Sequence, residues 1–235
     1  MNIIPVIDLL DGKVVHAKRG DRKNYQPINS PLCTSSDPMH ITQSLIELYP
    51  FKELYIADLN SIQRNGHHYD TIKTINRRFP HIELWLDSGF SEVSDLYEWH
   101  DLPIKFVIGT ESLRSMDNYL AIKRVYQHQL ILSLDFTPTG YKGPPELLED
   151  SSSWPEKVIA MTLNHVGSGL GPDMKKLNEI LSASTHSAIY AAGGVRDATD
   201  ISTLTSMGIQ GALIASALHS GDLSAKQLEA VFANQ

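Results

Sequence analysis

Three aspartates, Asp8, Asp58 and Asp135, each come directly after a short apolar run of this sequence. A carboxylate at the end of a buried strand costs desolvation energy unless it is paired or used in a reaction. Two carboxylates that face each other suit general acid–base catalysis, because burial can leave one ionised and the other protonated. We therefore predict Asp8 and Asp135 as a catalytic pair. The alternative is that each aspartate accepts hydrogen bonds from the backbone of the loop that follows it.

Two segments of small residues near the end of the chain are candidates for phosphate binding. Gly193 and Gly194 follow one apolar run, and Ala215 and Ser216 end the next. Glycine lets backbone N–H groups approach an anion closely, and the start of a helix adds partial positive charge. We predict that these four residues bind phosphate. The alternative is that Gly193 and Gly194 only form a tight turn.

Other chemistry has less support in the sequence. His67 and His68 are adjacent and diverge, and no His or Cys cluster has metal-site spacing, so we predict no metal. No Gly-rich mononucleotide loop is present, and we predict no cofactor. The single cysteine, Cys33, lies in a polar stretch without an activating neighbour. His165 is interpreted as a solvated loop histidine, with a contact to substrate as the alternative.

Eight short apolar runs, separated by amphipathic segments, must position these residues. Such nearly continuous apolar runs are typical of parallel strands covered on both faces. Eight βα units leave a closed (β/α)8 TIM barrel or an open doubly wound sheet, and we predict the α/β barrel, as one domain over residues 1–235. Its active site is expected at the C-terminal ends of the strands. The expected strands are Ile3–Ile7, Leu54–Ala57, Ile82–Leu86, Phe106–Ile108, Leu130–Leu134, Val158–Met161, Ala188–Ala191 and Ala212–Ala215.

Helix-start signals precede most of the amphipathic segments. One gap differs, because Pro144–Trp154 is short, polar and Ser-rich, and we expect a degenerate helix there. The polar segment Gly20–Ser36 is a candidate mobile loop. The predicted helix starts are Asp37, Ser91, Asp173, Asp197 and Ser224, and a further helix is expected over Met116–Gln127.

Weak internal similarity favours the closed barrel, because it indicates a half-barrel that is repeated twice. Gly89 and Gly194, in similar surroundings, are 105 residues apart. The segments 106–110 and 212–216 are also similar, at an offset of 106.

Asp58 and Thr110 also follow apolar runs directly, and we predict that they contribute to substrate binding.

Composition excludes several classes of partner. The formal net charge is −7 and no basic run occurs, so we expect no nucleic-acid partner. No apolar run approaches ~20 residues and the first residues lack signal-peptide character, so we expect no membrane partner. One cysteine fits a cytoplasmic setting. The expected partner is a phosphorylated small molecule, and the oligomeric state is left open.

Several segments resemble the ProFAR isomerases of histidine biosynthesis and, in part, the sister cyclase that makes imidazole glycerol phosphate. The resemblance implies an Amadori rearrangement of an aminoaldose phosphate to an aminoketose phosphate. It also implies that Asp8 removes the C2 proton and that Asp135 is the acid of the fifth strand. The C-terminal phosphate loop would be formed by Gly193, Gly194, Ala215 and Ser216. The segments that carry it are Ile4–Val15, Gly20-Asp21, Val107–Thr110, Ser133–Asp135, Ala191–Val195 and Ala217-Leu218.

The sequence departs from this family at three places. Gly167 stands where the isomerases have an acid after the sixth strand. Phe136–Gly140 lacks the arginine of the fifth loop, and no Trp follows this loop until Trp154. Asp87, Ser88 and Ser91 stand in a loop that in the family has three glycines and an arginine. A carboxylate there opposes a phosphate dianion by charge repulsion, and the lost arginine removes a bidentate donor. ProFAR has phosphates at both ends, whereas this chain is predicted to bind one.

Three functions follow from these observations. The first is an intramolecular isomerase of aldose–ketose type that acts on a phosphorylated small molecule, similar to isomerase-related proteins encoded in archaea and methylotrophs among genes for one-carbon cofactor synthesis. The second is authentic ProFAR isomerase. The third is a non-catalytic barrel that binds a phosphorylated metabolite, which the loss of the sixth-strand acid favours and the presence of Asp8 and Asp135 disfavours.

Overall fold

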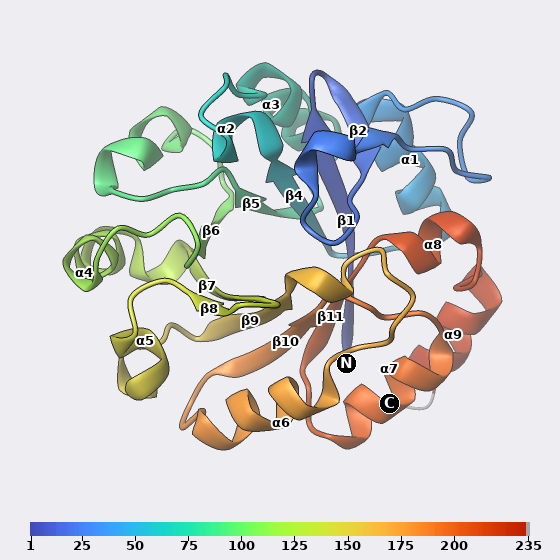
Figure 1. Cartoon of the computed structure of the whole chain (residues 1–235). Helices are drawn as coiled ribbons and strands as arrows, with labels where there is room; N and C mark the ends of the chain where they lie inside the picture. The colour runs from blue at the N-terminus through green and yellow to red at the C-terminus, as the bar shows by residue number, and fades with distance from the viewer. Residues whose placement is uncertain (234–235) are drawn as a thin grey trace.

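A computed structural model describes residues 1–233 and contains a closed barrel of eight parallel strands with helices around it (Figure 1). The barrel closes where the first strand pairs with the last, with Asn2 opposite Gly211 and Pro5 opposite Ile214. This pairing confirms the predicted (β/α)8 barrel and excludes the open sheet. The predicted domain, residues 1–235, extends beyond the described range. The barrel strands are β1 (Asn2–Leu10), β4 (Glu53–Asp58), β5 (Glu83–Asp87), β6 (Lys105–Gly109), β7 (Leu130–Thr137), β9 (Lys157–Thr162), β10 (Ala188–Ala192) and β11 (Gly211–Ile214).

Three further strands extend the sheet beyond the barrel, and none of them was expected. Strand β2 (Lys13–His16) pairs antiparallel with β1, and β3 (Gln26–Pro27) pairs with β2. Strand β8 (Gly140–Lys142) pairs antiparallel with the end of β7. These hairpins prolong β1 and β7 past their catalytic candidates. Strand β3 lies within Gly20–Ser36, whose mobility stays a prediction.

The helices begin close to the predicted caps. Asp37 accepts hydrogen bonds from the backbone of Met39 and His40, at 3.0 and 3.1 Å, a cap that stabilises a helix by about 1 kcal/mol. Asp173 and Asp197 also cap their helices as predicted. The α-helices are α1 (Pro38–Leu48), α2 (Leu59–Ile62), α3 (Tyr69–Arg78), α4 (Met116–Tyr126), α5 (Glu146–Glu149), α6 (Met174–Ala183), α7 (Ala198–Ser206), α8 (Ser216–Ser220) and α9 (Ala225–Ala233).

Two gaps between barrel strands hold only short helices. The helix predicted from Ser91 is a 3-10 helix, η2 (Val93–Trp99), which begins after Glu92. Asp95 accepts the backbone N–H groups of Ser91 and Glu92 and thereby fixes this start one residue later than predicted. The degenerate helix expected before β9 is confirmed as α5 followed by η4 (Ser151–Ser153). The remaining 3-10 helices are η1 (Arg22–Asn24), η3 (Gln127–Gln129) and η5 (Leu163–His165).

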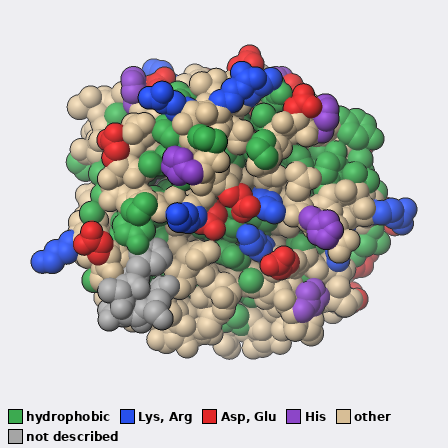
Figure 2. Space-filling view, turned by 180° about the vertical axis from the view of Figure 1, so that it is seen from behind, with side chains coloured by type: hydrophobic (Ala, Val, Ile, Leu, Met, Phe, Trp, Pro, Cys, Tyr) green, Lys and Arg blue, Asp and Glu red, His purple; other side chains and the backbone are tan. Residues whose placement is uncertain are grey.

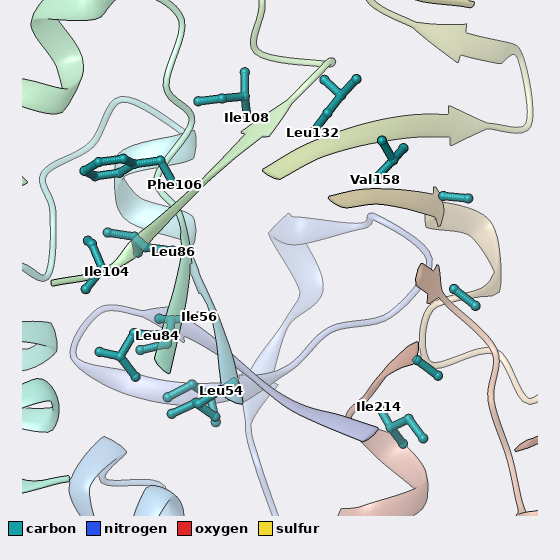
Figure 3. Close-up of a cluster of buried hydrophobic side chains, with 14 of the residues drawn as sticks. Leu54, Ile56, Leu84, Leu86, Ile104, Phe106, Ile108, Leu132, Val158 and Ile214 are labelled. Atoms are coloured by element: carbon teal, nitrogen blue, oxygen red, sulfur yellow. The ribbon is translucent and has the colours of Figure 1, made fainter. Parts of the chain in front are cut away.

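Side chains alternate between two apolar layers along each barrel strand, because successive residues of a strand point to opposite faces. The outer layer lies between the strands and the helices, as Figure 3 shows for residues such as Leu54, Ile56 and Phe106. The inner layer fills the barrel, where the Trp85 and Tyr190 rings meet edge to face at 5.1 Å. The side that a strand residue takes therefore decides whether it can reach the interior.

Charged residues gather at the N-terminal ends of the strands. Glu83 of β5 forms ion pairs with Lys105 and Lys157, at 3.8 and 3.6 Å, and accepts a hydrogen bond from Trp85 at 2.9 Å. Figure 2 shows acidic and basic side chains together near the centre of the face opposite to that of Figure 1.

Within residues 1–233, no helix combines the length and the apolar character that crossing a membrane requires.

Candidate active site

A cavity of about 280 Å³ lies at the C-terminal ends of the barrel strands. Small-molecule sites in proteins are concave, largely apolar and furnished with a few polar groups. This cavity has apolar walls, including Val6, Met161 and Leu213, and a set of carboxylates that enter it from the strands. Its position is the one that enzymes of this fold use.

Three aspartates line the cavity from three different strands: Asp8 of β1, Asp87 of β5 and Asp135 of β7. Each aspartate lies an even number of residues from an inner-layer residue of its own strand, so its side chain points to the barrel interior; Trp85, two residues before Asp87, is an example. The structure therefore brings the predicted pair, Asp8 and Asp135, into one cavity, and adds a third carboxylate. A methyl group on Gly109 would lie 3.2 Å from an Asp135 oxygen and 3.4 Å from an Asp87 oxygen, so these two carboxylates flank the same glycine.

Asp135 is held in place by its neighbours. Its Oδ1 accepts a hydrogen bond from the Ser133 hydroxyl at 2.7 Å, and its Oδ2 accepts the backbone N–H of Glu111 at 2.9 Å. The Asp135 backbone N–H donates to Thr110 Oγ1 at 2.9 Å. This support fixes the orientation of a carboxylate that is almost fully buried yet reaches the cavity.

Burial raises the pKa of all three carboxyl groups, because removal from water disfavours their charged form. The pKa of Asp8 rises to about 7, although Arg22 opposes the rise. The pKa of Asp135 rises to about 8 and that of Asp87 to about 6, although both accept backbone hydrogen bonds that favour the anion. These pKa values lie near neutrality, where proton transfer in either direction is most effective.

The loop after β10 supplies the glycines expected at a phosphate site. Gly193 and Gly194 have φ angles of +101° and +92°, which L-residues with side chains rarely adopt. A methyl group at Gly193 would lie 2.5 Å from the Thr162 carbonyl oxygen, and one at Gly194 would lie 2.2 Å from the Gly171 carbonyl oxygen. Both residues line the cavity, so the glycines bring backbone to its wall where a side chain has no room.

Four backbone N–H groups next to this loop are free. Those of Gly194, Val195, Ser216 and Ala217 have no hydrogen-bond acceptor among residues 1–233. All four residues line the cavity, together with Ala215, and strands β10 and β11 are neighbours. Converging free amides are the groups that bind a phosphate oxygen in proteins.

Two predicted substrate-binding residues, Asp58 and Thr110, do not line the cavity. Asp58 is fully buried, and its carboxylate accepts hydrogen bonds from Ser61 N and from His68 N and Nδ1, at 3.2, 2.7 and 2.8 Å. It shares the outer face of β4 with Leu54 and Ile56, which excludes it from the interior. For Asp58, the alternative of a carboxylate that caps its following loop describes the geometry. Thr110 directly follows β6 and continues the alternation of Phe106 and Ile108, which face the helices. Its Oγ1 accepts the backbone N–H of Asp135.

Several lining residues were not predicted. Arg22 of η1 forms an ion pair with Glu111, which follows β6, and both reach the cavity. Tyr55 of β4 donates a hydrogen bond to Asp87 Oδ2 at 3.1 Å. The alternation of side chains along β4 and β5 would have placed Tyr55 and Asp87 inside the barrel. Nothing in the sequence predicts the path of the loop that carries Arg22.

His165, which was interpreted as a solvated loop residue, also lines the cavity. Its Nδ1 lies 2.6 Å from the Gly171 carbonyl oxygen, an acceptor, so Nδ1 carries a proton. In the neutral ring, Nε2 is then free to accept a proton or a hydrogen bond.

Among residues 1–233, no group of three or more His, Cys, Asp or Glu side chains has the arrangement of a metal site.

A closed (β/α)8 barrel with acid–base candidates and free amides at its C-terminal end is the architecture of small-molecule enzymes. The model of the histidine biosynthesis protein family matches residues 2–224, and the chain belongs to this family. The resemblance seen in the sequence is therefore confirmed.

Individual relatives cover nearly the whole chain. An uncharacterized protein of Methanocaldococcus jannaschii is 30% identical over 234 residues, 97% of each chain. The 1-(5-phosphoribosyl)-5-((5-phosphoribosylamino)methylideneamino)imidazole-4-carboxamide isomerase of Bacteroides fragilis is 26% identical and covers 98% of this chain and 99% of its own. The enzyme of the same name from Halothermothrix orenii is 26% identical, over 95% and 96%. The family thus includes proteins named as isomerases, and this chain is a divergent member.

Proposed function

We propose that this protein is an intramolecular isomerase that acts on a phosphorylated small molecule by acid–base catalysis. One observation carries the proposal: Asp8 and Asp135 line the same cavity as the four free amides. The amides of Gly194 and Ser216 would bind the phosphate and thereby hold the reacting carbons over the floor of the cavity. Fixing a substrate in this way lowers the entropic part of the barrier.

Proton transfer follows from the two pKa values. Asp8, with a pKa of about 7, would remove a proton from the carbon next to a carbonyl or imine group. Asp135, with a pKa of about 8, would be the protonated partner that donates to the oxygen or nitrogen, or that orients it. Such general acid–base catalysis contributes about 10²–10⁴ in rate for each group. His165 Nε2 is a further acceptor in the cavity, from the segment where Gly167 replaces the acid of the isomerases.

Deuterium incorporation tests this proposal before the substrate is known. A phosphometabolite extract is incubated in D₂O with the purified protein and with the Asp8→Asn variant. We expect a pair of isomeric phosphometabolites to change in ratio, with one deuterium bound to carbon, in the wild-type sample alone. Equal labelling by the two proteins would contradict the role of Asp8. A metabolite that raises the melting temperature of the wild-type protein and is never consumed would instead favour the non-catalytic barrel.

The names of the relatives favour a second candidate, ProFAR isomerase itself. Complementation of a histidine auxotroph that lacks this enzyme tests it, with Asp8→Asn as the matched control. Growth at the wild-type rate would establish the histidine pathway as the place of action. The role in one-carbon cofactor synthesis stays a prediction.

A further inference from the structure

The two halves of the barrel treat equivalent backbone amides differently. Gly89, which lies 105 residues before Gly194, donates its N–H to Asp87 Oδ1 at 3.0 Å. Glu111, which lies 106 residues before Ala217, donates its N–H to Asp135 Oδ2 at 2.9 Å. The N–H groups of Gly194 and Ala217 have no acceptor within residues 1–233. The repeat therefore offers free amides at one side of the cavity and internally satisfied amides at the other.

Asp87 is the residue that makes this difference in the first half. Its counterpart through the same offset is Ala192, whose methyl group accepts no hydrogen bond. Tyr55 donates to the second oxygen of Asp87, so the carboxylate is held from both sides. A phosphate at this loop would have to displace a tethered carboxylate from the amide and then remain beside its charge.

The charges around Asp87 act in the same direction. Glu111 also lines this side of the cavity, and its ion pair with Arg22 offsets the charge of that cation, so Arg22 does not compensate the charge of Asp87. Like charges that are removed from water repel each other strongly. A second phosphate dianion is therefore unfavourable at this side, even where the cavity has room for it.

Gly109 keeps the space between the two carboxylates open. It lies within β6 and its φ is not in the left-handed region, so backbone conformation does not require glycine there. A methyl group would lie 3.2 and 3.4 Å from oxygens of Asp135 and Asp87, which is crowded. Small groups that donate hydrogen bonds fit such a space, because the ionised Asp87 carboxylate only accepts.

We propose that Asp87 determines the specificity of the site: the substrate carries one phosphate, at Gly194 and Ser216, and its other end presents hydroxyl or amino groups to Asp87 and no second phosphate. This inference rests on the proposed function, because it assumes that the free amides bind a phosphate. It names the substrate class more narrowly, as a monophosphate with a hydrogen-bond-donating far end.

The number of inorganic phosphate ions bound per chain tests the proposal, by calorimetric titration and by crystals soaked in phosphate. We expect one phosphate for the wild-type protein and two for Asp87→Gly, which frees the Gly89 amide. The control Asp87→Asn keeps an acceptor for that amide while removing the charge, and we expect it to bind one. In Asp87→Gly, a further Gly194→Ala substitution should remove the first phosphate and leave the second. Melting temperatures report whether each variant is folded.

Two phosphates in the wild-type protein, or one in a folded Asp87→Gly variant, would overturn the inference. A second phosphate in Asp87→Asn would overturn the role of the occupied amide. A wild-type protein that binds no phosphate would contradict the proposed function itself, and this inference with it.

Sugar phosphates provide a test of the far end. Ribulose 1,5-bisphosphate should bind to the wild-type protein at least tenfold more weakly than ribose 5-phosphate, and Asp87→Gly should abolish this preference. Glucosamine 6-phosphate against glucose 6-phosphate then distinguishes an amino group from a hydroxyl group. A wild-type preference for the bisphosphate would overturn the proposal.

Discussion

Replacing the candidate base, Asp8→Asn, should stabilise the protein at neutral pH while it removes activity. Burial raises the pKa of Asp8 from 3.8 to about 7, so the folded protein binds the Asp8 proton more tightly than the unfolded chain does. Its contribution to stability is then fully present below pH 3.8 and is lost as the pH rises toward 7. The loss amounts to about 4 kcal/mol at most, from about 1.4 kcal/mol per pKa unit. Because Asp8 is partly exposed, we expect about 2–4 kcal/mol.

Urea unfolding of wild type and Asp8→Asn at a series of pH values measures this effect. The difference in the free energy of unfolding should be small near pH 4, should increase by up to about 1.4 kcal/mol per pH unit, and should level off above pH 7. No side-chain hydrogen bond to Asp8 is found among residues 1–233, so the amide should fit without losing a partner.

The control is Asp70→Asn, which makes the same change of side chain at an exposed position, the start of α3. A stability difference for Asp8→Asn that stays constant from pH 4 to pH 8 would refute the argument that Asp8 is desolvated. It would also remove the physical basis for its role as a base at neutral pH.

Further predictions concern catalysis and ligand binding. The rate of the proposed isomerisation should depend on pH as a bell, rising through about 7 as Asp8 ionises and falling above about 8 as Asp135 does; a flat profile would contradict these roles. Arg22→Gln removes a cation that lowers the Asp8 pKa, so the acid limb should move to higher pH, and an unchanged limb would show that Arg22 does not act on Asp8. Gly194→Ala should weaken phosphate binding at least tenfold, measured by calorimetry, because the methyl group would collide with a carbonyl oxygen; unaltered affinity would place the phosphate elsewhere. His165→Gln should lower kcat by about 10²-fold with little change in phosphate affinity, because it removes the Nε2 acceptor that faces the substrate in the cavity; an unchanged kcat would show that His165 takes no part in proton transfer.

The barrel was predictable because its signal is repeated eight times. Each strand is a short apolar run, buried on both faces, and errors at single boundaries do not affect the count. The three added strands were missed for a physical reason. Strands β2, β3 and β8 have two to four residues, and only β2 has buried ones, so their pairing depends on β1 and β7 and leaves little trace in the local sequence.

The site was predictable only where its residues lie on strands. Asp8 and Asp135 follow apolar runs and share the inner parity, so geometry and pattern agree. Asp58 shows the limit of the pattern, because a strand-end acid can take either face. Every second residue of a strand points to the same face. Asp87 therefore shares the inner face of β5 with Trp85, and Asp58 shares the outer face of β4 with Ile56.

Loop residues could not be placed in this way. Arg22 reaches the cavity because the β1–β2 hairpin and η1 fold back over the barrel mouth, and a contact of this kind between distant parts of the chain has no local pattern. His165 lies on η5, where its ring is oriented by the Gly171 carbonyl oxygen, six residues further on. Its orientation depends on a turn rather than on the period of a strand.

The arrangement of the carboxylates links stability to specificity. Asp8, Asp87 and Asp135 all have raised pKa values, so each lowers the stability of the folded protein at neutral pH. A barrel retains such groups without structural need when they act on a ligand. The Asp135 carboxylate is supported by Ser133 and that of Asp87 by Tyr55, whereas the Asp8 carboxylate has no hydrogen-bond partner among residues 1–233. A carboxylate that is desolvated yet unpartnered is the one most free to take a proton from a substrate, which is why the base is assigned to Asp8 and the roles of orientation and specificity to the other two.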